Sequence, residues 1–193
     1  MASFSMIGRV GLIKIANPPV NSLGLAVRKG LFDAIKQAEK SGARALVIAG
    51  DGATFPAGAD IKEFATGGAL DKPTLGDVID QLDKATMPTV AAVHGTAFGG
   101  GLELALTCHF RLFSSKALCG LPEVHLGLLP GAGGTQRLPR LIGCEKALNM
   151  MTSGMPVGAA AAVEMGLADK VVPGVEGQAV LDAALELAQV TSS

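Results

Sequence analysis

The chain has 193 residues, which fits one domain over residues 1–193 that needs no disulfide or metal to stabilise its core. Its formal net charge of −1, with 16 basic and 17 acidic residues, argues against a nucleic-acid-binding surface or a polybasic membrane patch. Hydrophobic residues make up 49% and charged residues only 17%, so we expect an oligomer or another domain to cover part of the surface.

The first predicted elements are a strand and a helix. Residues 10–15 (VGLIKI) predict a β-strand, which the Asn-Pro-Pro of 17–19 ends because proline cannot continue a ladder. Helical spacing of apolar residues then predicts an amphipathic helix from Ser22 to about Lys40. Its apolar positions are Val27, Leu31, Ile35 and Ala38, and its opposite face carries Arg28, Lys36, Gln37 and Lys40.

Two wholly apolar strands are each followed by a glycine-rich loop. The strand 45–49 precedes the loop 50–60, and the strand 89–93 precedes the loop 95–101. Such strands are typical of a parallel sheet that is buried on both faces. With a short helix around 77–84 between them, the order predicts an α/β protein whose site lies on the loops after the strands.

The second half continues this alternation. We expect a helix over 102–108, a strand over 110–113 and a glycine- and proline-rich connection over 126–143. Two helices, near 144–152 and 158–165, a strand over 169–172 and a final helix over about 175–189 are expected to follow. The final helix has an apolar stripe that must dock on its own core, pack onto another copy of the chain, or fray. This stripe comprises Val180, Leu181, Ala184, Leu185 and Ala188.

Cysteine and histidine spacing does not indicate a metal site. The three cysteines lack a CxxC spacing and are expected to be buried, reduced thiols, and the three histidines show no HExxH pattern. These residues are Cys108, Cys119, Cys144, His94, His109 and His125. The N-terminus lacks a signal-peptide pattern and no segment suits a membrane span, so we expect the cytoplasm as the compartment.

The chemistry of the chain is expected around three consecutive glycines and two glutamates. Gly99–Gly101 open a helix and expose backbone N–H groups that can bind a phosphate or stabilise an oxyanion. No dinucleotide or phosphate-loop motif is complete here. Taken alone, Glu103 is interpreted as a carboxylate that stabilises the first turn of a helix. Glu123, taken alone, is interpreted as a solvent-exposed carboxylate in a loop. If both carboxylates lie beside oxyanion donors, they could instead share one water molecule, with one acting as general acid and the other as general base.

Three segments together resemble the enoyl-CoA hydratase/isomerase (crotonase) family. They are AGAD at 57–60, MPTVAAVHGTAFGGGLELAL at 87–106 and GLPEVHLGLLPGAGGTQRLPRLIG at 120–143. The sequences of these segments are most similar to the N-terminal hydratase part of bifunctional fatty-acid oxidation enzymes. The resemblance implies a spiral of ββα turns and reversible addition of water to a trans-2-enoyl-CoA, giving 3-hydroxyacyl-CoA. Δ3-Δ2 enoyl-CoA isomerisation is a possible second activity, and coenzyme A enters only as part of the substrate.

The resemblance also assigns roles to individual residues. The backbone N–H groups of Ala59 and Gly100 would form the oxyanion hole for the thioester carbonyl. Glu103 would orient the water and take its proton, and Glu123 would deliver a proton to C2. Gln136 and Arg137 are expected to be structural. The coenzyme A path would run along Ala57, Ala59, Asp60, Ile61, Lys62 and Gly100.

Two departures from the family leave alternatives open. Pro56 precedes AGAD where relatives commonly have a small residue, and the C-terminal helices that build trimers in the family are absent. The chain is therefore expected to be a fragment or a shortened member, either a homo-oligomer or part of a longer multifunctional chain, with the peroxisome as the alternative compartment. The alternative functions are another acyl-CoA hydrolase or decarboxylase of this fold, and a coenzyme A-binding fragment without activity.

Overall fold

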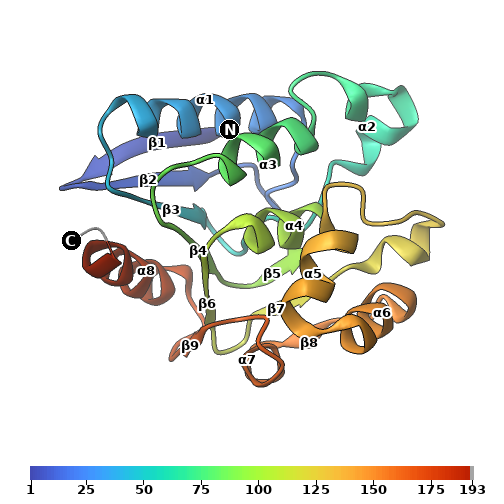
Figure 1. Ribbon diagram of the computed structural model, residues 1–193. Coiled ribbons are helices and arrows are strands. Elements are labelled where there is room, and N and C mark those ends of the chain that lie inside the picture. The colour runs from blue at the N-terminus through green and yellow to red at the C-terminus, as the bar shows by residue number, and fades with distance from the viewer. Residues whose placement is uncertain (192–193) are drawn as a thin grey trace.

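The computed structural model describes residues 1–191, apart from the side chains of 64 and 65, and has an α/β fold with two sheets (Figure 1). Within these residues the larger sheet has six strands in the order β1-β2-β3-β4-β6-β9. Only β1 and β2 pair antiparallel, and every other neighbouring pair is parallel. The strands are β1 (Ala2–Ile7), β2 (Val10–Ile15), β3 (Ala45–Gly50), β4 (Thr89–Val93), β6 (Phe110–Ser114) and β9 (Lys170–Val172).

Alternating side chains of the larger sheet enter two separate cores. In β3, Leu46 and Ile48 join the main core, together with α1 (Leu25–Lys40), α3 (Leu75–Asp83) and α4 (Gly100–Thr107). The intervening β3 residues join the second core, on the opposite face, because successive side chains of a strand point to opposite sides. Burial on both faces explains why the central strands are almost continuously apolar.

Helix α8 (Gly177–Thr191) covers the second face of the larger sheet (Figure 1). Val180, Leu181, Ala184 and Ala188 are buried, and the half-buried Leu185 packs beside them. Of the three outcomes that the stripe left open, the structure therefore shows docking on its own core. Among residues 1–191, no helix is long and apolar enough to cross a membrane.

A smaller sheet alternates with the larger one along the chain. It contains β5 (Thr96–Phe98), β7 (Leu118–Gly120) and β8 (Val157–Gly158). The chain passes from β4 to β5 to α4, and then from β6 to β7 to the 3₁₀-helix η2 (Pro122–Leu126), so two successive turns each take one strand from each sheet. This arrangement is the expected ββα spiral.

Five further helices complete the fold of residues 1–191. The sequence analysis missed the edge strand β1, the three short strands of the smaller sheet and four helices, which are η2 and the first three helices given next. The helices not yet introduced are α2 (Ile61–Thr66), η1 (Gly68–Leu70), α5 (Gly134–Ile142), α6 (Cys144–Ser153) and α7 (Ala159–Glu164).

Two side-chain predictions are wrong. Arg28 is not on the polar face of α1 but is only 3% exposed. It lies three and seven residues before Leu31 and Ile35, so it shares their face of the helix. Cys144 is exposed, because α6 begins at this residue and buries only Ala147 and Met150. Cys108 and Cys119 are buried as expected, and burial raises the pKa of each thiol to about 12.

Candidate active site

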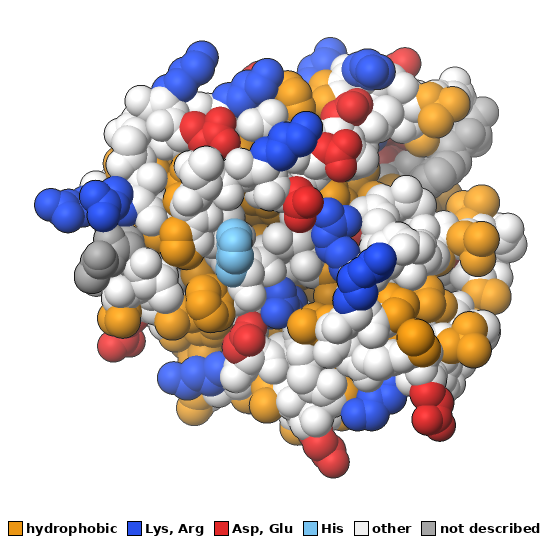
Figure 2. Space-filling view, in the orientation of Figure 1, with side chains coloured by type: hydrophobic (Ala, Val, Ile, Leu, Met, Phe, Trp, Pro, Cys, Tyr) orange, Lys and Arg blue, Asp and Glu red, His pale blue; other side chains and the backbone are white. Residues whose placement is uncertain are grey.

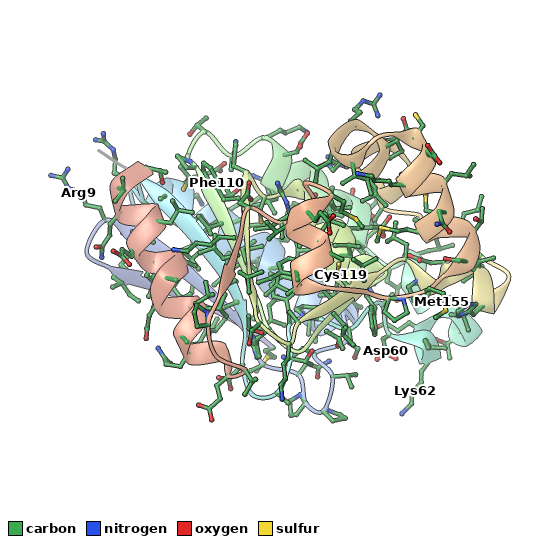
Figure 3. The ribbon with its side chains drawn as sticks, turned by 90° about the horizontal axis from the view of Figure 1, so that it is seen from below. Arg9, Asp60, Lys62, Phe110, Cys119 and Met155 are labelled. Carbon is green, nitrogen blue, oxygen red and sulfur yellow. The ribbon has the colours of Figure 1, made fainter. Side chains whose placement is uncertain are left out.

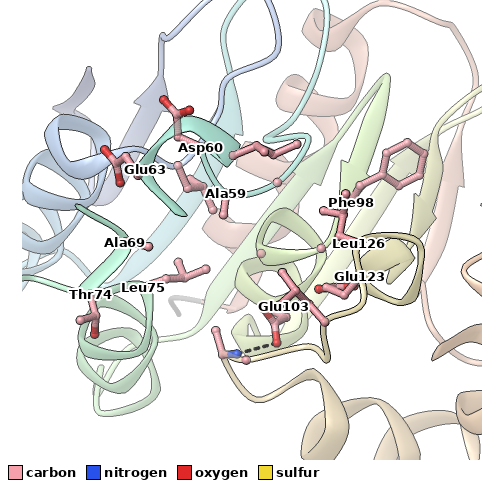
Figure 4. Close-up of a pocket in the computed structure, with 18 of the residues that line it drawn as sticks. Ala59, Asp60, Glu63, Ala69, Thr74, Leu75, Phe98, Glu103, Glu123 and Leu126 are labelled. Atoms are coloured by element: carbon pink, nitrogen blue, oxygen red, sulfur yellow. Dashed lines mark hydrogen bonds between the residues drawn. The ribbon is translucent and has the colours of Figure 1, made fainter. Parts of the chain in front are cut away.

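A cavity of about 490 Å³ opens between the two glycine-rich loops and the segments that follow them (Figure 4). Leu23, Arg28 and residues from four further stretches of chain line it; the stretches are 57–63, 69–76, 98–103 and 122–132, not every residue of which contacts the cavity. In the close-up, Glu103 and Glu123 lie on one side of the pocket, with Glu63, Ala69 and Leu75 on the other. The topology therefore brings the two predicted glutamates and both glycine-rich loops to one site.

Each glycine of the run before Glu103 meets a different requirement. Gly99 has a φ of 50°, a left-handed conformation that favours glycine. Gly100 begins α4 and lines the pocket. Gly101 packs so tightly that an added Cβ would lie 1.8 Å from the carbonyl oxygen of Pro56. Pro56, which departs from the family pattern, therefore packs against the first turn of α4.

The two predicted oxyanion donors lie next to each other. A Cβ built on Gly100 would be 3.7 Å from the Ala59 backbone nitrogen. As the first residue of α4, Gly100 has no carbonyl one turn earlier in the helix to receive its N–H. The loop that carries Ala59 is fixed by backbone hydrogen bonds from Leu23 N–H to Gly58 O (2.9 Å) and from Ala57 N–H to Val20 O (3.0 Å).

Glu103 is held by the start of α5. The side chain is buried, and its Oε1 accepts hydrogen bonds from the N–H groups of Ala132 (2.7 Å) and Gly134 (2.9 Å). Burial raises the pKa of Glu103, while the N–H groups of Gly134 and Ala132 and the charge of Arg137 oppose this rise. Because both donors contact Oε1, they leave Oε2 for other partners.

Glu123 is half-buried in η2, not solvated in a loop. Its Oε2 is buried and has no hydrogen-bond partner among the described residues, and its Oε1 lies beside Gly99. Burial raises the pKa of Glu123 to about 7, and the neighbouring charge of Glu103 adds to the rise. The two carboxyl groups therefore differ, because two backbone N–H groups from another segment bind Oε1 of Glu103, whereas only the backbone N–H of Glu123 itself opposes the rise of the Glu123 pKa.

Most of the predicted coenzyme A segment lies at the cavity. Ala57, Ala59, Asp60 and Ile61 line it, whereas Lys62 does not. The Asp60 side chain caps α2 by accepting a hydrogen bond from the Lys62 N–H (3.1 Å). Figure 3 shows Lys62 projecting from the outer edge of the molecule. Lys62 therefore lies outside the cavity, although its neighbours Ile61 and Glu63 line it.

The histidines are separate from this site. His94 is buried behind the first glycine-rich loop, 3.0 Å from Gly52 O, His109 bonds to Thr89, and His125 bonds to Ser153 O. Within residues 1–191, no group of three or more His, Cys, Asp or Glu residues is arranged to hold a metal ion.

Gln136 and Arg137 both lie in α5, where Arg137 contacts α3 and Gln136 contacts a residue one turn later in the same helix. Arg137 Nη2 is 3.1 Å from Asp83 on α3, and Gln136 accepts hydrogen bonds from Arg140. These contacts are of the structural kind that the sequence predicted for the two residues.

The sequence analysis missed a polar pair and several apolar residues in the pocket wall. Arg28 and Glu63 form an ion pair of 2.5 Å at the wall. Burial opposes ionisation of Glu63, but the Leu25 N–H and the Arg28 guanidinium outweigh it and hold the pKa below its usual value. The only available signal for Arg28 was its helical spacing to apolar residues. The missed apolar lining residues include Leu75, Phe98, Leu126, Leu128 and Leu129.

Comparison with known proteins identifies relatives of the whole spiral. The family model described as enoyl-CoA hydratase/isomerase matches residues 7–192. A peroxisomal bifunctional enzyme from Danio rerio is 47% identical over 173 residues, which are 89% of this chain and 24% of that protein. A probable enoyl-CoA hydratase from Bacillus subtilis is 42% identical over 164 residues, 82% of this chain and 64% of that protein. The chain thus spans about a quarter of the length of its bifunctional relatives.

Solved structures show the same fold. The crystal structure of an enoyl-CoA hydratase from Bacillus anthracis superposes with a TM-score of 0.89 at 34% sequence identity, covering 99% of this chain and 76% of that one. An enoyl-CoA hydratase structure from Geobacillus kaustophilus gives a TM-score of 0.88 at 36% identity. On the family match and these similarities, the chain belongs to the enoyl-CoA hydratase/isomerase family.

Proposed function

We propose that this chain is an enoyl-CoA hydratase that adds water to trans-2-enoyl-CoA, giving 3-hydroxyacyl-CoA, in fatty-acid β-oxidation. One observation carries the proposal: Glu103 and Glu123, in different hydrogen-bonding environments, line the same pocket as the N–H-bearing residues Ala59 and Gly100. The hydratase and β-oxidation names of the relatives support the same activity.

In this proposal, the thioester carbonyl oxygen is bound by the N–H groups of Ala59 and Gly100. These donors stabilise the charge that develops on the oxygen as water attacks C3. Glu103 accepts a proton from the attacking water, whose oxygen forms the new bond to C3. Glu123 gives its proton to C2, so one molecule of water is added in total. The donors at Oε1 of Glu103 favour its ionised form, and the raised pKa of Glu123 favours its protonated form.

The rest of the pocket suits the remaining parts of an acyl-CoA. The proposed reaction uses no metal or redox cofactor, because the conjugated thioester itself makes C3 electrophilic. We place the coenzyme A portion along Ala57–Lys62 and at Gly100. The apolar side chains of the pocket would then contact the acyl chain. Isomerisation of a 3-enoyl-CoA is a second activity that Glu123 could support by moving a single proton.

Incubation with crotonyl-CoA tests the proposal directly. Hydration removes the conjugated double bond, so the ultraviolet absorbance of the enoyl thioester should fall with time. The chain contains no Trp or Tyr, which keeps the protein background low. Release of free coenzyme A would instead indicate the hydrolase alternative. Binding without turnover would indicate a coenzyme A-binding domain, and either result would contradict the hydratase proposal.

We expect kcat/KM for hydration to fall as pH rises through about 7. The raised pKa of Glu123 means that its proton, which the reaction needs, is lost above this value. At low pH, protonation of Glu103 should lower the rate again. A pH profile with crotonyl-CoA measures both limbs, and a rate that stays constant from neutral pH to about two units above it would contradict this assignment.

A stability measurement provides the control. A carboxyl group with a raised pKa in the folded state makes folding less favourable as pH rises from its ordinary pKa toward about 7. Glu123→Gln lacks this group, so its Tm relative to the parent chain should increase over that range and then stay level.

We also propose a homo-oligomer. Exposed leucines surround the pocket mouth, and Figure 2 shows hydrophobic side chains gathered on the side formed by the 126–130 loop and α6. Leu126, Leu128 and Leu129 are 57%, 41% and 80% exposed, and Leu148 on α6 is 60% exposed. We expect light scattering to show self-association that Leu129→Ser together with Leu148→Ser reduces. A parent chain that stays monomeric at high concentration would contradict this.

The protein context is proposed from the same relatives. Several relatives are multifunctional chains, and part of a longer chain is the alternative to a homo-oligomer. We propose the cytoplasm as the compartment, with the peroxisome as the alternative because some relatives carry that name.

A further inference from the structure

Arg28 is bonded through every N–H of its guanidinium. Nε donates to Pro73 O (2.9 Å), Nη1 to Leu23 O (3.1 Å) and to Glu63 Oε2 (2.5 Å). Nη2 donates to the carbonyl oxygens of Gly68 (3.0 Å) and Asp71 (3.2 Å). These five contacts use the full donor capacity of an arginine side chain.

Four of the five acceptors lie between Ile61 and Thr74, a segment that forms one wall of the pocket. None of the described side chains in this segment is fully buried, and Ile61 and Leu70 are 64% and 81% exposed. The described side chains therefore provide little apolar packing for the segment. Instead, three of its carbonyl oxygens, those of Gly68, Asp71 and Pro73, accept hydrogen bonds from the buried Arg28 guanidinium. These bonds fix the path of the chain.

Glu63 extends this anchor to the start of α1. Its Oε1 accepts the N–H of Leu25 at 2.6 Å, while its Oε2 pairs with Arg28. The carboxylate thus ties α2 to the first turn of α1, the helix that carries Arg28. The loop of Ala59 is fixed separately, by its own backbone hydrogen bonds.

We propose that Arg28, together with Glu63, is a positioning residue for this reaction: it holds the wall 61–74 in place against the acyl chain of the substrate. This inference rests on the proposed function. Ala69, Leu70 and Leu75 of this region line the pocket. A long acyl chain contacts more of that wall than a four-carbon one does. Loosening the anchor therefore weakens binding of long substrates and leaves the chemistry at the glutamates intact.

Arg28→Lys keeps the positive charge and loses the planar fork that reaches several acceptors at once. We expect the KM for trans-2-dodecenoyl-CoA to rise about tenfold or more. For crotonyl-CoA, KM should rise less than about threefold, with kcat nearly unchanged for both substrates. Glu63→Gln should shift KM in the same direction by less, and it serves as the test if Arg28→Lys does not fold.

Arg111 offers a matched control. It is also buried, at 5% exposed, donates to the carbonyl oxygens of Leu167 and Cys108, and pairs with Asp169 at 3.6 Å. It does not line the pocket. Arg111→Lys should lower Tm without changing the ratio of KM values between long and short substrates. Equal ratios in the Arg28 and Arg111 variants would overturn the proposal.

Amide hydrogen exchange separates this proposal from the hydratase assignment. In Arg28→Lys, peptides from 61–74 should exchange about tenfold faster, with no comparable change in the Arg111 variant. Unchanged exchange in 61–74 would overturn the anchor, whatever the activity. A parent chain that anchors this segment but hydrates no enoyl-CoA would instead contradict the proposed function alone.

Discussion

Glu103→Gln and Glu123→Gln should each lower kcat for hydration of crotonyl-CoA by about 10²–10⁴-fold, the usual size of a general acid or base contribution. Neither amide side chain can exchange a proton as the carboxyl group does. The two losses should be far from additive in the double variant, because both groups act in one addition of water. Steady-state kinetics on the two single variants and the double variant measure this.

The structure indicates that both variants will fold. The two N–H donors of Ala132 and Gly134 contact only Oε1 of Glu103, so the carbonyl oxygen of a glutamine can accept both. Glu123 Oε2 has no partner among the described residues, so replacement by an amide breaks no bond at that atom. Glu145→Gln, an exposed position in the first turn of α6, is the control and should keep full activity. A loss below about tenfold in both active-site variants would contradict the two-glutamate mechanism.

Isomerisation, proposed above as a second activity, provides a further test of the same variants. Moving a double bond from C3 to C2 transfers a proton without adding water, so it needs an acid–base group but no water-activating base. With a 3-enoyl-CoA as substrate, Glu123→Gln should therefore cause the larger loss. A larger loss in Glu103→Gln would argue that the roles are reversed.

The sequence predicted the parts of the fold in which burial is periodic. The central strands β3 and β4 contribute residues to both cores, and the helices α1 and α4 pack into the main core, so their apolar pattern is strong. Strand β1 lies at the edge of the sheet with mostly exposed side chains, and the strands of the smaller sheet are two or three residues long. Tertiary pairing defines such strands, and a short window of sequence carries little signal for it.

In the candidate site, too, some residues could be predicted from the sequence and others could not. The motifs identified Glu103, Glu123 and the two glycine-rich loops, because these residues lie in short, distinctive segments. Arg28 lies far from them in sequence, and an arginine on a helix is usually solvated. Its burial becomes visible only when the carbonyl oxygens of 68–73 surround it. Lys62, which the family resemblance assigned to the coenzyme A path, does not line the cavity and projects outward, so its contact with coenzyme A stays a prediction.

Gly100→Pro should lower kcat by about 10²–10³-fold, because it removes a backbone donor that no side-chain substitution can reach. Proline is tolerated at the first position of a helix, where the N–H has no intrahelical partner. The ring nevertheless adds a Cβ, which at this position would lie 2.6 Å from Leu75 Cδ2, at the far end of a flexible side chain.

Gly100→Ala separates the two effects of the proline. It introduces the same Cβ and the same contact with Leu75 but keeps the N–H. Circular dichroism must first show that both variants are folded, and each is then assayed with crotonyl-CoA. If the amide donates to the thioester oxygen, the alanine variant retains much more activity than the proline variant. If both lose activity equally, the contact with Leu75 explains the loss, and Gly100 is not the donor on which the proposed oxyanion hole depends.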